Sequence, residues 1–174
     1  PACTGYGSAN KVAASPVRPD MTHLRAINPM HWYALNQEED RRHGRHFSEG
    51  ATTLAAAQVG KELGYWSGFW WSYNVDEFLR VLHDQDAVII GSNWYESMWD
   101  RDREGIARIR PGSFNAGGHL YCLNGYDPRR GLVRHVSSWN DGIYWHPVED
   151  LHRLFREDAE CLITFETVPV APVT

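Results

Sequence analysis

The fold is decided by one stretch, GGHLYCLNGYD, at residues 117–127. Its two glycines let the backbone pass close to a substrate, and His119 follows them directly. Residues 118–126 have the composition of a strand, and the turn-forming residues 127–131 join them to a second predicted strand over 132–139. We therefore predict a β-hairpin with His119 at a strand end that faces a site.

The sequence before this hairpin is mainly helical, and the sequence around it is strand-like. Predicted helices start at or just after Cys3 and cover residues 30–42, 52–63 and 148–156, with one more opening after the cap Asn74. Further strands are predicted over residues 87–93, 142–145 and 161–168. This order predicts an α+β fold in a single domain, residues 1–174, with a helical lobe over about 1–85, a sheet lobe over about 86–168 and a tail over 169–174.

Composition excludes several classes of protein. The 174 residues are 43% hydrophobic and 22% charged, so the chain can bury a core without a metal or a disulfide. A net charge of -5 without a basic stripe argues against nucleic acid and anionic membranes as partners. The longest apolar run, 87–90, is far shorter than the ~20 residues of a membrane span, and residues 1–4 do not resemble a secretory signal.

The three cysteines have different sequence contexts. Cys3 lies at the N-terminus of a predicted helix, where free amide groups and the helix dipole stabilise thiolate over thiol. An imidazolium close by would add to this effect. Cys122 and Cys161 lie inside apolar predicted strands, and we interpret them as small buried hydrophobic residues. Cys3 is therefore the candidate nucleophile.

Nine histidines are candidates for the partner of Cys3. We predict that His43, His46, His146 and His152 are exposed to solvent, because they stand in polar turns or near a helix start. They lack a third neighbouring ligand group, so no metal site is predicted. His119, after its glycines, is the candidate partner.

With these motifs in place, the chain resembles the papain-like cysteine peptidases, especially their short microbial and viral members. Residues 2–6, ACTGY, resemble the nucleophile helix of that family, and residues 117–127 resemble its glycine-histidine strand. Residues 137–140, SSWN, resemble the Asn-Ser-Trp-Gly motif, and residues 47–50, FSEG, resemble the glycine segment that binds substrate. The resemblance implies two lobes with an active cleft between them.

The resemblance also assigns roles to residues. It implies Cys3 as nucleophile, His119 as its base and Ser137 as the residue that orients the imidazole. It implies substrate contacts at Glu49, Gly50, Gly118 and Trp139, where the backbone of Gly50 and Gly118 would bind an extended peptide and the indole would shield the histidine.

Two positions depart from the family pattern. Ser137 stands where the family has asparagine, and Asn140 could replace it only if the strand bends or bulges. Only Pro1 and Ala2 precede Cys3, so the family's oxyanion glutamine is expected to be missing or to come from a preceding segment.

The sequence thus predicts a thiol peptidase, or an amidase of peptidoglycan type, that needs no cofactor and acts on a peptide or cell-wall substrate. The protein itself is expected to derive from a bacterium or a phage. Two alternatives stay open. One is an impaired papain-like module that binds peptides or a partner, and the other is a structural role, for example in a viral particle.

Overall fold

The structure is a computed structural model that describes residues 2–14, 28–84, 86–139 and 142–166. Its helices are α1 (Cys3–Ala14), α2 (Pro29–Arg42), α3 (Thr53–Glu62), α4 (Val75–His83), the 3-10 turn η1 (Glu96–Trp99) and α5 (Val148–Arg156). Its strands are β1 (Trp66–Ser72), β2 (Val88–Tyr95), β3 (Asn115–Asp127), β4 (Leu132–Val136), β5 (Ile143–Pro147) and β6 (Glu160–Glu166). In the described part of the chain, no helix has the length and apolar character needed to cross a membrane.

The helix starts that were predicted from local sequence signals agree with the structure. The side chain of Asn28 caps α2 by accepting from the amide groups of Met30 and His31, and Thr52 caps α3 in the same way through the amide of Ala55. Asn74 caps α4, as predicted. Helix α1 begins at Cys3, so the predicted position of this cysteine at a helix N-terminus is confirmed.

The strands form one antiparallel sheet in the order β1-β6-β2-β3-β4-β5. The predicted hairpin is β3 and β4, although β4 ends at Val136, three residues before the predicted end. Strand β6 ends at Glu166, and residues 167–168 of the predicted last strand lie outside the described residues. Strand β1 was not predicted, so the expected helical lobe over residues 1–85 also contains a strand of the sheet.

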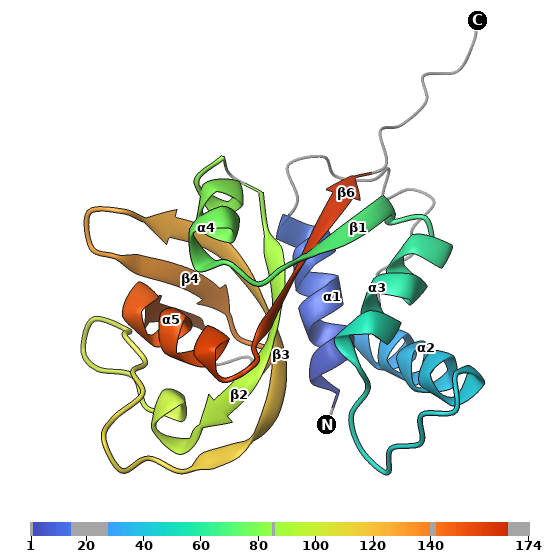
Figure 1. Cartoon of the computed structure of the whole chain (residues 1–174), viewed down its shortest axis with the longest axis horizontal. Helices are drawn as coiled ribbons and strands as arrows, with labels where there is room; N and C mark the ends of the chain where they lie inside the picture. Colours follow the sequence, from blue (N-terminus) through green and yellow to red (C-terminus); the bar gives the residue numbers. More distant parts are fainter. Residues whose placement is uncertain (1, 15–27, 85, 140–141, 167–174) are drawn as a thin grey trace, which may run out of the picture.

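The sheet separates two hydrophobic cores, because successive side chains of a strand point to opposite faces. Ile89 of β2 packs with residues of α1, α2 and α3, whereas its neighbours Val88 and Ile90 pack with residues of α4 and α5. Figure 1 shows α1, α2 and α3 together on one side of the molecule and α4 and α5 on the other. Both layers and the sheet between them confirm the predicted α+β fold.

Helix α1 touches the sheet closely at Gly7. A Cβ atom at this position would lie 2.3 Å from Cδ2 of Leu120, so a larger residue fits only if the Leu120 side chain, the helix or the strand moves. Leu120 follows His119 directly in β3. The contact therefore fixes the helix that carries Cys3 against the strand that carries His119.

Candidate active site

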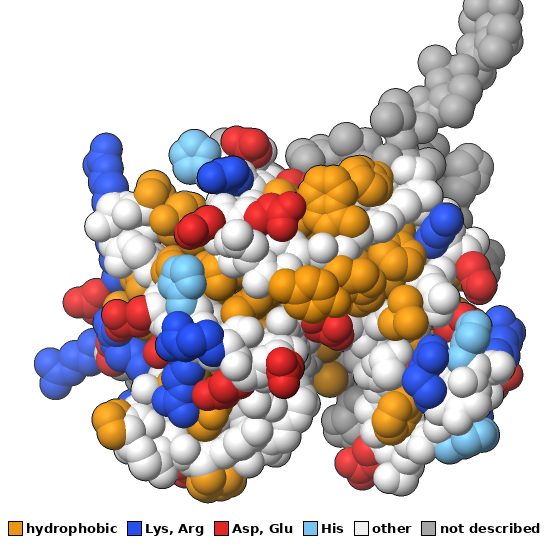
Figure 2. All heavy atoms as spheres, in the orientation of Figure 1, with side chains coloured by type: hydrophobic (Ala, Val, Ile, Leu, Met, Phe, Trp, Pro, Cys, Tyr) orange, Lys and Arg blue, Asp and Glu red, His pale blue; other side chains and the backbone are white. Residues whose placement is uncertain are grey.

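Two adjoining cavities lie between the helices and the sheet. Their volumes are about 840 Å³ and about 550 Å³, and Cys3 and His119 line both. The space-filling view shows a groove between the two halves at the lower edge of the face that it draws (Figure 2). Of the other predicted site residues, Glu49, Gly50 and Gly118 also line both cavities.

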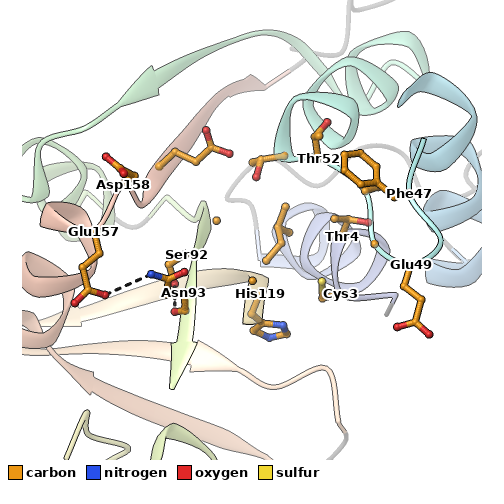
Figure 3. Close-up of a pocket in the computed structure, with 17 residues that line it drawn as sticks. Cys3, Thr4, Phe47, Glu49, Thr52, Ser92, Asn93, His119, Glu157 and Asp158 are labelled. Carbon is orange, nitrogen blue, oxygen red and sulfur yellow. Dashed lines mark hydrogen bonds between the residues drawn. The ribbon is translucent and has the colours of Figure 1, made fainter. Parts of the chain in front are cut away.

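Cys3 is the first residue of α1 and is partly exposed in this cleft. The first amide groups of a helix have no intrahelical acceptor, so they stabilise negative charge at this end. Figure 3 shows Cys3 and His119 among the residues that line the larger cavity, with His119 coming from β3. Among the described residues, no hydrogen bond joins the Sγ atom of Cys3 to that ring.

The other two cysteines are buried, as predicted. Cys122 is 1% exposed and Cys161 is not exposed at all. Burial raises the pKa of Cys122 to about 12 and that of Cys161 well above its usual value. Both thiols are therefore protonated at neutral pH and shielded from reagents.

Aromatic rings surround the imidazole of His119, which is 9% exposed. Trp139 stacks on it with the ring centroids 4.7 Å apart and an angle of 13° between the planes. Tyr121 lies nearly parallel to it at 5.6 Å, and Trp94 meets it edge-on at 4.7 Å. These contacts hold the ring in one plane. Trp139 itself stays 43% exposed and lines the smaller cavity.

Burial lowers the pKa of His119 to about 3, with a further contribution from the charge of His146. The ring is therefore a neutral imidazole at pH 7 and, with so low a pKa, a weak base. This environment does not favour the imidazolium that the sequence analysis expects beside Cys3.

Ser137 does not make the contact that its predicted role requires. It is 8% exposed, and its Oγ atom accepts from the backbone amide of Trp139 at 3.0 Å. The Nε2 atom of His119 is buried and has no hydrogen-bond partner among the described residues. Asn140, the alternative, lies outside the described residues. The described contacts that orient His119 are thus those with aromatic rings.

The prediction for one histidine was wrong. His43, His46 and His152 are exposed as expected, but His146 is 1% exposed and its Nε2 atom lies 3.2 Å from Nδ1 of His135. It lies on β5, where successive side chains point to opposite faces of the sheet, and its own side chain points into the protein interior. Within the described ranges, no group of three or more potential ligand side chains could hold a metal ion.

The segment that carries Glu49 and Gly50 is held by α2. The amide of Gly50 donates to the hydroxyl of Tyr33 at 3.0 Å, and its carbonyl accepts from the side-chain amide of Gln37 at 3.3 Å. The amide of Gly50 is therefore already paired within the protein, and a backbone hydrogen bond from Gly50 to a substrate would use the second lone pair of its carbonyl. Glu49 remains exposed at the mouth of the cleft.

Asp40 anchors the same segment from inside α2. This carboxylate is 1% exposed and accepts from Nε of Arg45 at 2.6 Å and from both the amide and the hydroxyl of Thr52 at 2.7 Å. It thereby fixes both ends of the segment between α2 and α3.

Asp40→Ala is expected to lower the free energy of unfolding by about 2 to 3 kcal/mol, because it leaves buried donors without their charged acceptor. Urea denaturation followed by circular dichroism measures the change. Glu38→Ala is the matched control on the same helix. Its ion pairs with Arg41 and Arg42 are half exposed, so we expect a change below about 1 kcal/mol. Equal losses in the two variants would contradict the anchoring role of Asp40.

Comparison with known proteins identifies the fold. No model of a protein family matches the chain, and no curated protein matches it. The structure is similar to that of xylellain, a cysteine protease from Xylella fastidiosa, with a TM-score of 0.66 at 15% sequence identity, covering 96% of this chain and 80% of xylellain. Such a likeness at low identity concerns the fold alone: the chain has the mixed α+β fold of a cysteine protease.

Proposed function

We propose that this chain is a cysteine peptidase or a peptidoglycan-type amidase of papain-like type, with Cys3 as nucleophile and His119 as general base. One observation carries the proposal. A cysteine at a helix N-terminus and a neutral histidine, from distant parts of the chain, line the same cleft. The likeness to a cysteine protease of the same fold supports it.

In the proposed reaction, a nitrogen of His119 takes the thiol proton while the sulfur of Cys3 attacks the amide carbon. The carbon–sulfur bond forms, and the oxyanion lies near the free amide groups at the start of α1. His119 then gives the proton to the departing amine as the carbon–nitrogen bond breaks. Water, deprotonated by His119, hydrolyses the thioester and restores both side chains.

Substrate would lie along Gly118, with Trp139 beside the histidine and Glu49 at the mouth of the cleft. A Cβ atom at Gly118 would have no atom within 4 Å, so this stretch of β3 is open to the cavities. Trp94 and Trp99 line the smaller cavity with Trp139 and give it an aromatic wall. Peptides and cell-wall peptides, which present extended amide backbones, fit such a cleft.

A binding module without turnover is the second candidate. The unpartnered Nε2 atom of His119 favours it, because an imidazole that no acceptor orients is a weaker base. In that case a Cys3→Ala variant would bind peptides as the parent chain does, and neither protein would cleave them.

Alkylation tests the proposed nucleophile. Iodoacetamide at pH 7 is expected to label Cys3 at least about 100-fold faster than Cys122 or Cys161, because those two thiols are buried and protonated. Peptide mass mapping gives the three rates, and turnover of casein or of cell-wall fragments should fall in step with labelling of Cys3. Equal labelling of the three thiols, or full turnover after Cys3 is alkylated, would count against the proposal.

A further inference from the structure

His119 is the middle ring of an aromatic stack. Trp139 lies nearly parallel to the imidazole with the ring centroids 4.7 Å apart, and Tyr121 lies nearly parallel to it at 5.6 Å. In the described part of the chain, no ring contact joins Trp139 to Tyr121, so the two rings cover opposite faces of the imidazole. Another ring can therefore approach the imidazole only at its edge.

Trp94 stands beside this stack. Its ring lies 4.7 Å from that of His119 with an angle of 68° between the planes, and it lies 5.5 Å from both Tyr121 and Trp139. Because both faces of the imidazole are covered, this contact brings the edge of the imidazole against the face of the indole. Trp94 is 2% exposed, so the surrounding rings hold it in this position.

The sheet places Trp94 next to His119. His119 of β3 pairs with Ser92 of β2, and Trp94 pairs with Gly117. Trp94 is therefore the diagonal neighbour of His119 on the same face of the sheet, within reach of a large side chain. The register of the two strands shifts directly after Trp94. Irregular pairing of this kind is common next to active sites, where it re-aims a side chain.

The two ring nitrogens of His119 have different surroundings. Nε2 is buried and has no hydrogen-bond partner among the described residues. Nδ1 makes no hydrogen bond in the described ranges and is not buried, so it is the nitrogen that the cavities reach. The edge that meets the indole thus carries Nε2. The indole N–H group of Trp94 is also unpaired, so no hydrogen bond between nitrogens joins the two rings.

The polar side chains around the imidazole are already paired. The hydroxyl of Tyr121 shares a hydrogen bond with the hydroxyl of Ser92 at 3.1 Å. Nδ1 of His135 lies 3.2 Å from Nε2 of His146, and the hydroxyl of Ser137 accepts from a backbone amide. Of the described groups around the ring, the indole face is the electron-rich surface left for the buried nitrogen.

We propose that Trp94 is a positioning residue for His119, whose Nε2–H group donates to the face of the indole. An N–H group that points at an aromatic face makes a weak hydrogen bond, because that face carries negative charge. The contact keeps the proton on Nε2, so the lone pair of Nδ1 is free to take the thiol proton of Cys3. The ring then becomes an imidazolium, and the same indole face stabilises this cation. The inference rests on the proposed function and adds the group that orients its base.

The Nε2–H proton of His119 tests this inference without a substrate. In protein that carries isotope-labelled histidine, we expect this proton at pH 7 as a slowly exchanging signal at high field, because the ring current of the indole shields it. The signal is assigned by its loss in His119→Gln. Trp94→Leu, which removes the aromatic face, should move the signal to lower field or lose it through exchange with water. Trp94→Phe, which keeps an aromatic face, should retain most of the shielding.

Two control variants make the result specific. Trp71→Leu removes an indole from β1, outside both cavities, and should leave the signal unchanged. Asn140→Ala removes the other candidate acceptor and should also leave it unchanged. A low-field proton in the parent chain would indicate an oxygen or nitrogen acceptor and would overturn the inference. An unmoved signal in Trp94→Leu would overturn it as well.

A second substitution covers the case in which Trp94→Leu does not fold. A ring-fluorinated tryptophan in place of Trp94 keeps the shape of the indole and weakens the negative charge of its face. Exchange of the Nε2–H proton should then be faster than in the parent chain. An unchanged exchange rate would show that the indole face does not hold this proton.

Turnover separates this inference from the proposed function. We expect kcat of Trp94→Leu to fall roughly tenfold to thirtyfold, with KM nearly unchanged, because a desolvated cation loses its aromatic partner. Trp94→Phe should recover part of the rate. Cys3-dependent cleavage with full kcat in Trp94→Leu would overturn the inference and leave the proposed function standing. If the parent chain cleaves no peptide, the proposed function fails, and the proton signal still decides whether the indole orients the imidazole.

Discussion

Replacing Cys3 by alanine is expected to lower kcat/KM for a peptide or cell-wall amide by roughly 10⁴-fold or more. The change removes the atom that forms the covalent bond with the substrate, while the cleft and its amide groups stay in place. A discontinuous assay that detects released amine at high enzyme concentration measures the residual rate. The fold is expected to survive, because Cys3 is partly exposed and alanine is a good helix former.

Cys122→Ala is the matched control for this variant. Cys122 lies on β3 as His119 does, but it is buried and outside both cavities. We expect turnover by this variant to be unchanged, apart from a modest loss of stability from the missing sulfur. Full activity in the Cys3→Ala variant would show that the thiol is not the nucleophile.

Acid is expected to destabilise the fold between about pH 6.5 and pH 4. Burial lowers the pKa of His119 to about 3 and that of His146 to about 4, and it lowers that of His135 well below its usual value. Below the unfolded-state pKa of about 6.5, the unfolded chain therefore binds protons that the folded chain does not. Each of these histidines then costs up to about 1.4 kcal/mol of unfolding free energy per pH unit as the pH falls.

Urea denaturation at pH 7, 5.5 and 4.5 measures this slope. His146→Gln should reduce the slope by up to about 1.4 kcal/mol per pH unit, because one buried proton acceptor is removed. His152→Gln, at an exposed position of α5, should leave it unchanged. An unfolding free energy that stays flat from pH 6.5 to 4.5 would contradict the interpretation that these rings are buried and neutral.

Local signals in the sequence were sufficient for most of the fold. The caps Asn28, Thr52 and Asn74 act within a few residues of themselves, so the helix starts could be predicted without knowledge of the rest of the chain. Strand β1 could not be predicted in this way. Polar and apolar residues do not alternate clearly along its aromatic run, and its partner β6 lies at the other end of the chain. A strand that depends on such a distant partner carries little local signal.

The candidate site was predictable in part. Cys3 and His119 stand next to a helix start and a pair of glycines, which are features of the sequence itself. The burial of His146 depends on which face of β5 packs against the rest of the protein. The hydroxyl of Ser137 accepts from the amide of Trp139 because the chain turns after β4. The larger cavity is lined by residues of α3, β2 and β6, three elements whose meeting no local pattern reveals.

The close contact between Gly7 and Leu120 has a mechanical consequence. The helix with the sulfur is braced against the strand with the imidazole only a few residues from each reacting group. A bulky residue at position 7 would force α1 and β3 to adjust at this point, and such an adjustment would be passed directly to the two residues at the base of the cleft.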